Sequence, residues 1–147
     1  MGHGCIIFNI MNMSKGAFEK QSSDVLSVLG NPFRVRIALA LGDGEACVCH
    51  LEQMLNKRQA YISQHLMVLR EAGLLNTRRD GKYIYYQLAS KDILALIRSA
   101  AKLAGMDPAD FPREQEHTHL PKCDCPHCGE NQTINNDVKK AREASRA

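Results

Sequence analysis

Several features that identify membrane proteins, secreted proteins or common enzymes are missing from this sequence. No hydrophobic run is long enough to cross a membrane, and the apolar segment GCIIFNIMNM is short, with no basic region before it and no small-residue cleavage site. Glycine-rich phosphate loops are absent, and no Cys-His-Asp arrangement points to a cysteine nucleophile. We therefore expect a cytoplasmic protein that is not an enzyme, has no membrane partner and needs no organic cofactor.

What is present is an ordinary globular composition. Hydrophobic residues make up 44% of the chain and charged residues 24%, which argues against wholesale disorder. A length of 147 residues suits one domain with tails. After Gly105 the composition shifts to Pro, His, Asp and Glu. We expect an N-terminal arm over 1–17, one domain over 18–105, and a flexible tail with a Cys/His cluster over 106–147.

The positive charge is small in total but unevenly distributed. A net charge of +3 does not by itself predict a nucleic-acid partner. Between Asn56 and Lys82, however, six basic residues stand against two acidic ones, Glu71 and Asp80. Local positive charge of this kind favours phosphate binding. The six basic residues are Lys57, Arg58, Arg70, Arg78, Arg79 and Lys82.

Apolar periodicity and turn residues predict five helices and one β-hairpin. Gly30, Gly42 and Gly73 end helices, and Asp80-Gly81 suits a two-residue turn between alternating segments. The sequence thus predicts a mainly α protein with a small β-hairpin, in the order of a winged helix-turn-helix. The helices are expected over 18–29, 32–41, 49–55, 59–72 and 90–103, and the hairpin over LLNTRRDGKYIYYQL.

The last helix carries more apolar surface than one packing face uses. The segment SKDILALIRSAAKL includes Ile93, Leu94, Leu96, Ile97 and Ala101. An excess of this kind favours an interface with a second chain. We expect a homodimer that forms through the first and last helices.

The winged-helix order places candidate DNA-contacting residues at two positions. The start of the fourth helix would enter the major groove, where glutamine suits a bidentate contact with adenine. Flexible cations at the hairpin tip can reach a phosphate or the minor groove. A two-fold dimer would read a pseudo-palindromic operator. The candidates are Gln59, Tyr61, Ser63, Gln64 and His65 on the helix and Arg78, Arg79 and Lys82 on the wing.

Residues 45 to 88 resemble the core of the ArsR/SmtB winged-helix metalloregulatory repressors. The most specific stretches are CVC, SQHL, LREAGL and RRDGK, and with NPFRVRIALAL the resemblance covers about residues 20 to 104. It implies a dimeric repressor of metal export or detoxification operons that leaves its operator when a metal or metalloid binds. It also implies that Cys47 and Cys49, which match the CVC pair of arsenite, cadmium and lead sensors, are ligands.

Two departures limit what the resemblance transfers. His50 stands where those sensors often have Asp, so no role is carried onto it. Other members bind zinc, nickel or cobalt through His and carboxylates on the final helix. Here no histidine lies between Ser90 and Gly105, which argues against that site.

Thiol chemistry points to the same class of ion. In a reducing cytosol the six cysteines are more plausible as ligands or redox sensors than as a disulfide framework. Thiolates favour soft ions; three would suit arsenite, antimonite or lead, and a further ligand would suit zinc or cadmium. Residues 47 and 49 would point about 200° apart on a regular helix, so a C-x-C chelate needs a loosened first turn.

The third ligand stays open at this point. Cys5 is one candidate, provided that translation starts at Met1 rather than at Met11 or Met13. The cluster KCDCPHCGE offers three others, and its spacing suits a metal loop. A redox or persulfide switch that uses the same cysteines is the alternative. The three tail candidates are Cys123, Cys125 and Cys128.

Overall fold

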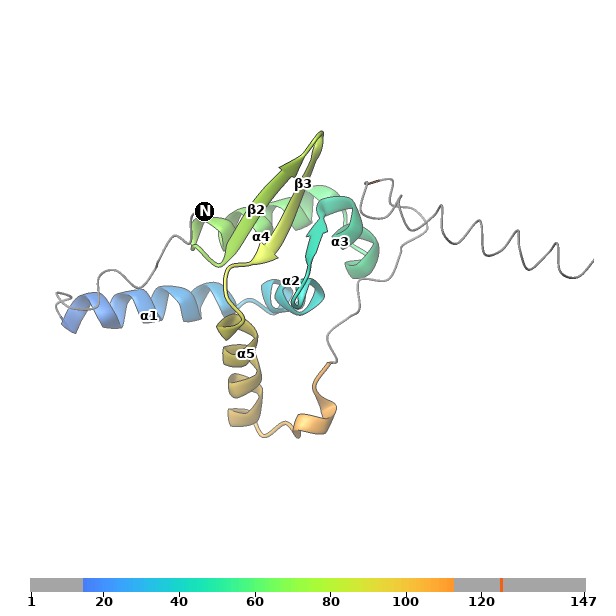
Figure 1. The fold of residues 1–147 in the computed structure, drawn as a ribbon. Coiled ribbons are helices and arrows are strands. Elements are labelled where there is room, and N and C mark those ends of the chain that lie inside the picture. The colour runs from blue at the N-terminus through green and yellow to red at the C-terminus, as the bar shows by residue number, and fades with distance from the viewer. Residues whose placement is uncertain (1–14, 113–124, 126–147) are drawn as a thin grey trace, which may run out of the picture.

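The computed structural model describes residues 15–112 and residue 125, which form five α-helices, a three-stranded sheet and a short 3-10 helix (Figure 1). No helix in these residues is both long and apolar enough to span a bilayer. In chain order the elements are α1 (Lys15–Leu29), α2 (Pro32–Leu41), β1 (Glu45–Cys47), α3 (Val48–Leu55), α4 (Gln59–Glu71), β2 (Leu75–Asp80), β3 (Tyr83–Leu88), α5 (Asp92–Leu103) and η2 (Pro108–Asp110).

Local sequence signals set the limits of α2. The Asn31 side chain accepts hydrogen bonds from the backbone N–H groups of Phe33 at 2.9 Å and Arg34 at 3.3 Å. Pro32 occupies the first turn, where a missing N–H costs nothing. Gly42 ends the helix with a φ of 52°, which a side chain would disfavour. The helix therefore begins and ends where the sequence predicts.

Residues with a left-handed backbone lie in the turn of the helix-turn-helix and just after its second helix. Asn56, with a φ of 50°, follows α3 and allows the tight connection to α4. Gly73, with a φ of 72°, follows α4; its N–H bonds the Arg70 carbonyl, and the Leu74 N–H bonds the Leu69 carbonyl. This pair of bonds is a Schellman motif.

The sheet has the strand order β1-β3-β2, and both pairings are antiparallel. β2 and β3 form the predicted hairpin, whose turn contains Gly81 with a φ of 57°. Tyr85 on the central strand pairs with Cys47 on β1 and with Arg78 on β2. Because directly opposed residues share a face of a sheet, these three side chains form one row across it.

The core lies between α2, α3, α4 and the base of the hairpin. Its fully buried residues include Ile37 of α2, Leu51 of α3 and Leu66 of α4. This packing fixes α4 against α3.

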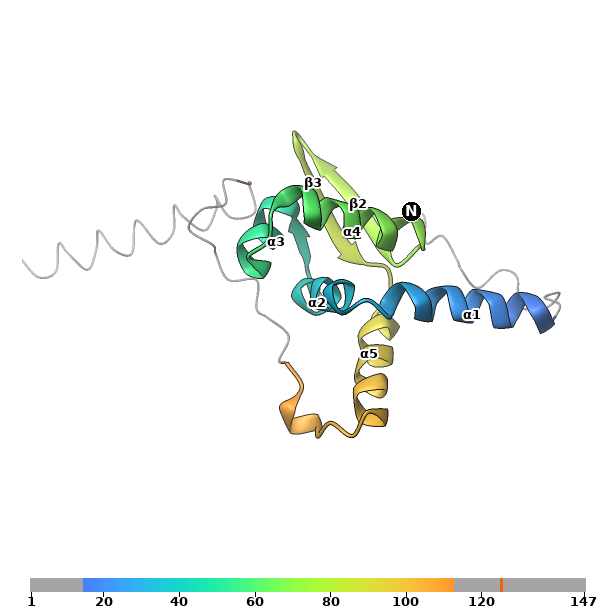
Figure 2. The ribbon, with the colours of Figure 1, turned by 180° about the vertical axis from the view of Figure 1, so that it is seen from behind.

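The helices α1 and α5 project from this body in different directions (Figures 1 and 2). Both carry exposed apolar side chains: Phe18 and Leu26 on α1, and Leu96 and Leu103 on α5. Leu103 is 91% exposed. Single exposed leucines are normal, but several on two projecting helices agree with a shared interface.

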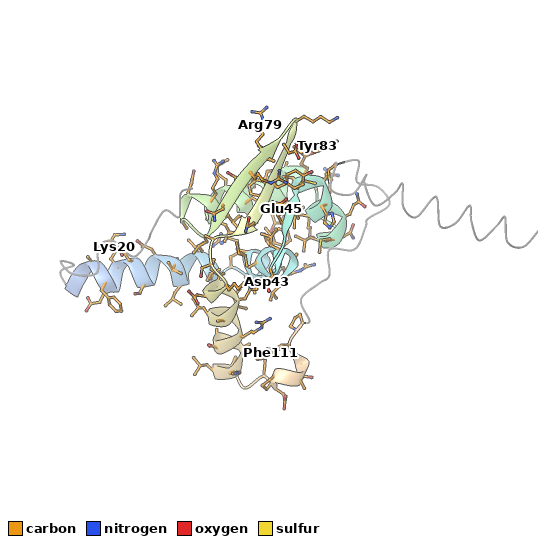
Figure 3. The ribbon with its side chains drawn as sticks, viewed as in Figure 1. Lys20, Asp43, Glu45, Arg79, Tyr83 and Phe111 are labelled. Atoms are coloured by element: carbon orange, nitrogen blue, oxygen red, sulfur yellow. The ribbon has the colours of Figure 1, made fainter. Side chains whose placement is uncertain are left out.

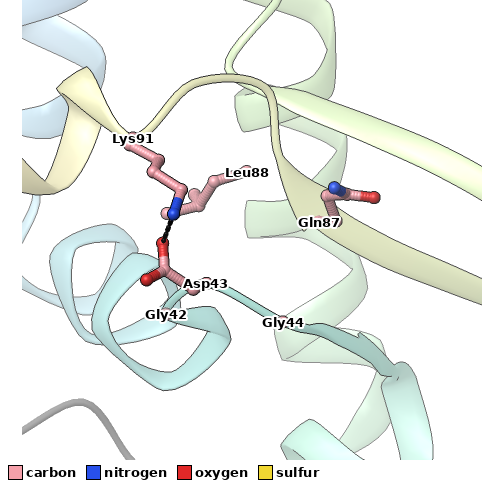
Figure 4. A pocket seen from close by; sticks show the side chains of 6 residues that line it. All are labelled: Gly42, Asp43, Gly44, Gln87, Leu88 and Lys91. Carbon is pink, nitrogen blue, oxygen red and sulfur yellow. Dashed lines mark ion pairs between the residues drawn. The ribbon is translucent and has the colours of Figure 1, made fainter.

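An ion pair links the base of α5 to the turn before β1 (Figure 4). The Lys91 Nζ lies 3.5 Å from the Asp43 carboxylate. This pair borders a small pocket whose lining contains no cysteine and no histidine. The lining residues are Gly42, Asp43, Gly44, Gln87, Leu88 and Lys91.

The predicted fold class is confirmed, with small differences. Five helices and the Asp80-Gly81 hairpin are present, although α3 begins at Val48 rather than at Cys49 and α5 at Asp92 rather than at Ser90. The sequence did not predict the short strand β1, which makes the sheet three-stranded.

Candidate thiol site and DNA-facing surface

Three cysteine side chains meet beside the helix-turn-helix. The Sγ atoms of Cys47, Cys49 and Cys125 all lie within 4.8 Å of one another. Cys47 and Cys125 are buried and Cys49 is half-buried. The structure therefore joins the predicted CVC pair to one of the three tail cysteines.

The two CVC thiols lie side by side because Cys47 stands outside the helix. Cys47 is the N-cap of α3 and is extended, with φ −81° and ψ 166°. Cys49 is the second residue of the helix, and the two Sγ atoms are 2.7 Å apart. The loosened first turn that a C-x-C chelate needs is thus supplied by the junction of β1 and α3.

Two tyrosines of the central strand surround the thiols. Tyr85 forms a buried cluster with Cys47 and Cys125, and Tyr83 and Cys49 pack against it. Sequence reasoning did not identify these tyrosines. The alternation in YIYYQL does place Tyr83 and Tyr85 on one face. Their position beside Cys47, however, depends on a pairing between distant strands.

The surroundings of Cys47 favour its protonated thiol form over the thiolate. Burial is the main cause that raises the pKa of the Cys47 thiol, and the neighbouring Cys49 and Cys125 thiols raise it further. A hydrogen bond from the His50 backbone acts in the opposite direction. A soft ion would therefore have to displace a proton from this thiol, and thiolate ligation commonly does so.

The exposed side of α4 carries the predicted base-reading residues. Ile62, Leu66 and Leu69 are buried on one side of the helix. Gln59 and Gln64 are exposed, and Ser63 is half-buried. This arrangement leaves amide groups available for contact with base edges.

Two other predicted DNA-contacting residues belong to an aromatic cluster. Tyr61 and His65 lie one turn apart on α4, with ring centroids 4.7 Å apart. Both rings also pack against Phe33 of α2, at 4.8 Å and 5.0 Å. Partial burial, with a smaller contribution from Arg34, lowers the pKa of His65.

The three predicted wing cations have different surroundings. Arg79 projects near the hairpin tip and donates from Nε to the Gly81 carbonyl at 3.0 Å (Figure 3). Lys82 lies over the Tyr83 ring, with its Nζ 5.3 Å from the centroid. Arg78 forms an ion pair with Glu45 of β1. The hydrogen bond to Glu45 is the main cause that raises the Arg78 pKa.

Other predicted site residues lie outside the part of the chain that the structure describes. These are Cys5 in the N-terminal arm and Cys123 and Cys128 in the tail. His50, to which the sequence assigned no role, is 5% exposed.

Residues 31–77 match the family model described as bacterial regulatory protein, arsR family. The chain is 43% identical over 86 residues to a biofilm growth-associated repressor of Agrobacterium fabrum, covering 56% of this chain and 74% of that protein. It is 45% identical over 65 residues to an arsenic resistance transcriptional regulator of Pseudomonas putida, covering 44% and 51%.

A solved structure agrees with these matches. It is the homodimeric winged helix-turn-helix DNA-binding domain of a possible ArsR-family regulator from Mycobacterium bovis, determined by NMR. The TM-score is 0.56 at 25% identity, and the match covers 74% of this chain and 98% of that one. The family match over residues 31–77 and the 43% identity to the Agrobacterium fabrum repressor, of which 74% is covered, together show the family. This chain belongs to the arsR family of bacterial regulatory proteins.

Proposed function

We propose that this protein is a cytoplasmic repressor that binds a pseudo-palindromic operator as a homodimer and leaves it when a soft ion binds Cys47, Cys49 and Cys125. The observation that carries the proposal is the convergence of three thiols within 4.8 Å at the start of α3. The arsenic resistance regulator of Pseudomonas putida and the homodimeric domain of Mycobacterium bovis are consistent with the ion and with the dimer.

The donor set favours a trigonal thiophilic ion. All three ligands in the described cluster are thiols, and three thiolates suit arsenite or antimonite. Lead fits the same set, whereas zinc and cadmium usually take a fourth ligand. Arsenite and antimonite are therefore the inducers to be tested first, ahead of lead, cadmium and zinc.

The site has a direct mechanical route to DNA. Ion binding must hold Cys47, which precedes α3, and Cys49, which lies in its first turn, at one point. α3 shares a core with α4 through Leu51 and Leu66, and the turn at Asn56 joins the two helices. A difference of about 3 kcal/mol in ion affinity between free and DNA-bound protein would weaken operator binding about a hundredfold.

The test is operator binding measured by fluorescence anisotropy under anaerobic reducing conditions, with each ion titrated separately. We expect arsenite or antimonite to release the DNA from the wild type, and Cys47→Ser, Cys49→Ser and Cys125→Ser to bind DNA without release. Cys5→Ser, Cys123→Ser and Cys128→Ser are the matched controls and should still release it. An unchanged release in the first three variants would show that these thiols are not the sensor.

A redox switch is the second candidate, because the Cys47 and Cys49 Sγ atoms are 2.7 Å apart. Oxidation by a peroxide would join the two sulfurs. The two thiols would lose two protons and two electrons, and the peroxide would be reduced to two water molecules, or to an alcohol and one water molecule. Release by peroxide in a chelator, with no release by any ion, would favour this candidate over the ion switch.

A further inference from the structure

We infer that the ion pair between Arg78 and Glu45, here called the wing bridge, couples the thiol site to the DNA-contacting wing. This inference rests on the proposed function and adds a second route to DNA beside the α3–α4 contact. It makes Arg78 and Glu45 positioning residues that act through the hairpin rather than on the ion.

The wing bridge crosses the central strand of the sheet. The Arg78 guanidinium on β2 lies 2.6 Å and 3.2 Å from the two carboxylate oxygens of Glu45 on β1. Two parallel N–H···O bonds of this kind fix the orientation of both groups. Since β3 lies between β1 and β2, the bridge spans all three strands.

Tyr85 contacts both the wing bridge and the thiol cluster. The Arg78 guanidinium carbon lies 4.7 Å from the centre of the Tyr85 ring, which places the cation over the ring. The same tyrosine is 2% exposed and packs in the buried cluster with Cys47 and Cys125. One side chain thus contacts both the wing arginine and the proposed sensor.

Glu45 and Cys47 belong to the same short strand. They are two residues apart, so they lie on the same face of β1. The Glu45 side chain is 23% exposed, whereas that of Arg78 is 50% exposed. A shift of β1 that brings Cys47 onto an ion would therefore move a partly enclosed carboxylate that holds the wing.

Arg78 has a second carboxylate partner that does not connect the wing to β1. Asp80 lies 3.4 Å from the guanidinium, but it belongs to β2, as Arg78 does. Glu45→Gln and Asp80→Asn each remove one negative charge beside the same arginine. The two substitutions should therefore have matched electrostatic effects on DNA binding. They differ because only Glu45 links the wing to β1.

The test measures operator affinity with and without arsenite for the wild type, Glu45→Gln and Asp80→Asn. Arsenite binding is measured in parallel by calorimetry without DNA, and folding by thermal melting. We expect about a hundredfold loss of affinity in the wild type and in Asp80→Asn, and about tenfold or less in Glu45→Gln. All three proteins should bind the same number of arsenite equivalents.

Arg78→Gln removes the other partner of the wing bridge. It replaces Glu45→Gln as the test variant if Glu45→Gln does not fold. It should show the same weakened release, and the double variant should lose no more coupling than either single variant. A hundredfold release in Glu45→Gln would overturn the wing bridge and leave the proposed function intact. A wild type that binds no arsenite, or binds it without releasing DNA, would overturn both.

Discussion

At the scale of single residues, a buried and an exposed apolar side chain are neighbours on α4, and we expect them to contribute differently to the free energy of unfolding. Leu66 is fully buried, whereas its neighbour Met67 is 51% exposed. We predict that Leu66→Ala lowers the free energy of unfolding by about 2 to 5 kcal/mol, because it leaves a cavity in the core. Met67→Ala should change it by about 0.5 kcal/mol or less. Urea unfolding measures both, and equal losses would contradict the packing described here.

We expect His65 to give the domain a pH-dependent stability. Partial burial and Arg34 lower its pKa in the folded state, so the unfolded chain binds its proton more readily. The contribution of His65 to stability is therefore present above its unfolded pKa of about 6.5 and is lost as the pH falls below that value.

His65→Gln should remove this contribution. We predict that wild-type stability falls more steeply than that of His65→Gln between about pH 7.5 and pH 5.5, because the other titrating groups are common to both proteins. Chemical unfolding at the two pH values measures the difference. A steeper fall in the variant would reverse the sign predicted here.

At the scale of elements, two glycines in open space should respond to alanine in opposite ways. An added Cβ meets no atom within 4 Å at Gly16 or at Gly73. Gly16 lies in α1, where alanine is the better helix former. Gly73 has a φ of 72° and ends α4, a conformation that disfavours a side chain.

We predict that Gly73→Ala lowers the free energy of unfolding by about 1 kcal/mol, and that Gly16→Ala raises it by up to about 1 kcal/mol. Thermal melting of both variants measures the two effects. Destabilisation by Gly16→Ala would show that α1 is not helical at this position in solution.

The sequence predicted elements best where the signal is local. α2 has a capping asparagine, a proline at its first position and a closing glycine, and both its limits are those predicted. β1 has three residues, too few to show an alternation, and it is a strand because it pairs with β3. Such pairing over a long stretch of chain depends on tertiary packing rather than on local preference.

The same distinction applies to the candidate site. The spacing of Cys47 and Cys49, with the family resemblance, predicted the pair, and its closeness follows from the N-cap position of Cys47. The sequence left Cys125 as one of several candidates. Neither Tyr85 nor the pairing of Arg78 with Glu45 was predicted, because both depend on the register of β3 with its two neighbours.

At the scale of the whole molecule, the proposed DNA-facing and dimer-forming surfaces are separate. The thiol site lies against β1, β3 and the start of α3, while α1 and α5 extend away from the sheet (Figures 1 and 2). The Asp43–Lys91 pair joins α5 to the turn that leads into β1. In the proposed dimer, we expect a change at β1 to alter the angle between the two DNA-binding halves as well as the wing.

The exposed apolar residues of α1 and α5 provide the final prediction. Phe18 is 68% exposed and Leu103 is 91% exposed, so a charge at either position should cost the monomer little. In a two-fold dimer each substitution counts twice. With about 1.5 kcal/mol or more lost per apolar side chain, we predict that Phe18→Glu or Leu103→Glu raises the dimer dissociation constant about a hundredfold or more.

Sedimentation equilibrium measures that constant. Ile84→Glu is the control for the effect of a new glutamate on association, because Ile84 is an exposed apolar residue of β3 rather than of α1 or α5. This variant should remain dimeric. Monomers would hold one operator half-site each, so Phe18→Glu and Leu103→Glu should also weaken binding to the full operator more than binding to a half-site. A dimer that withstands both substitutions would place the interface elsewhere, and the angle between its DNA-binding halves would then not depend on α5.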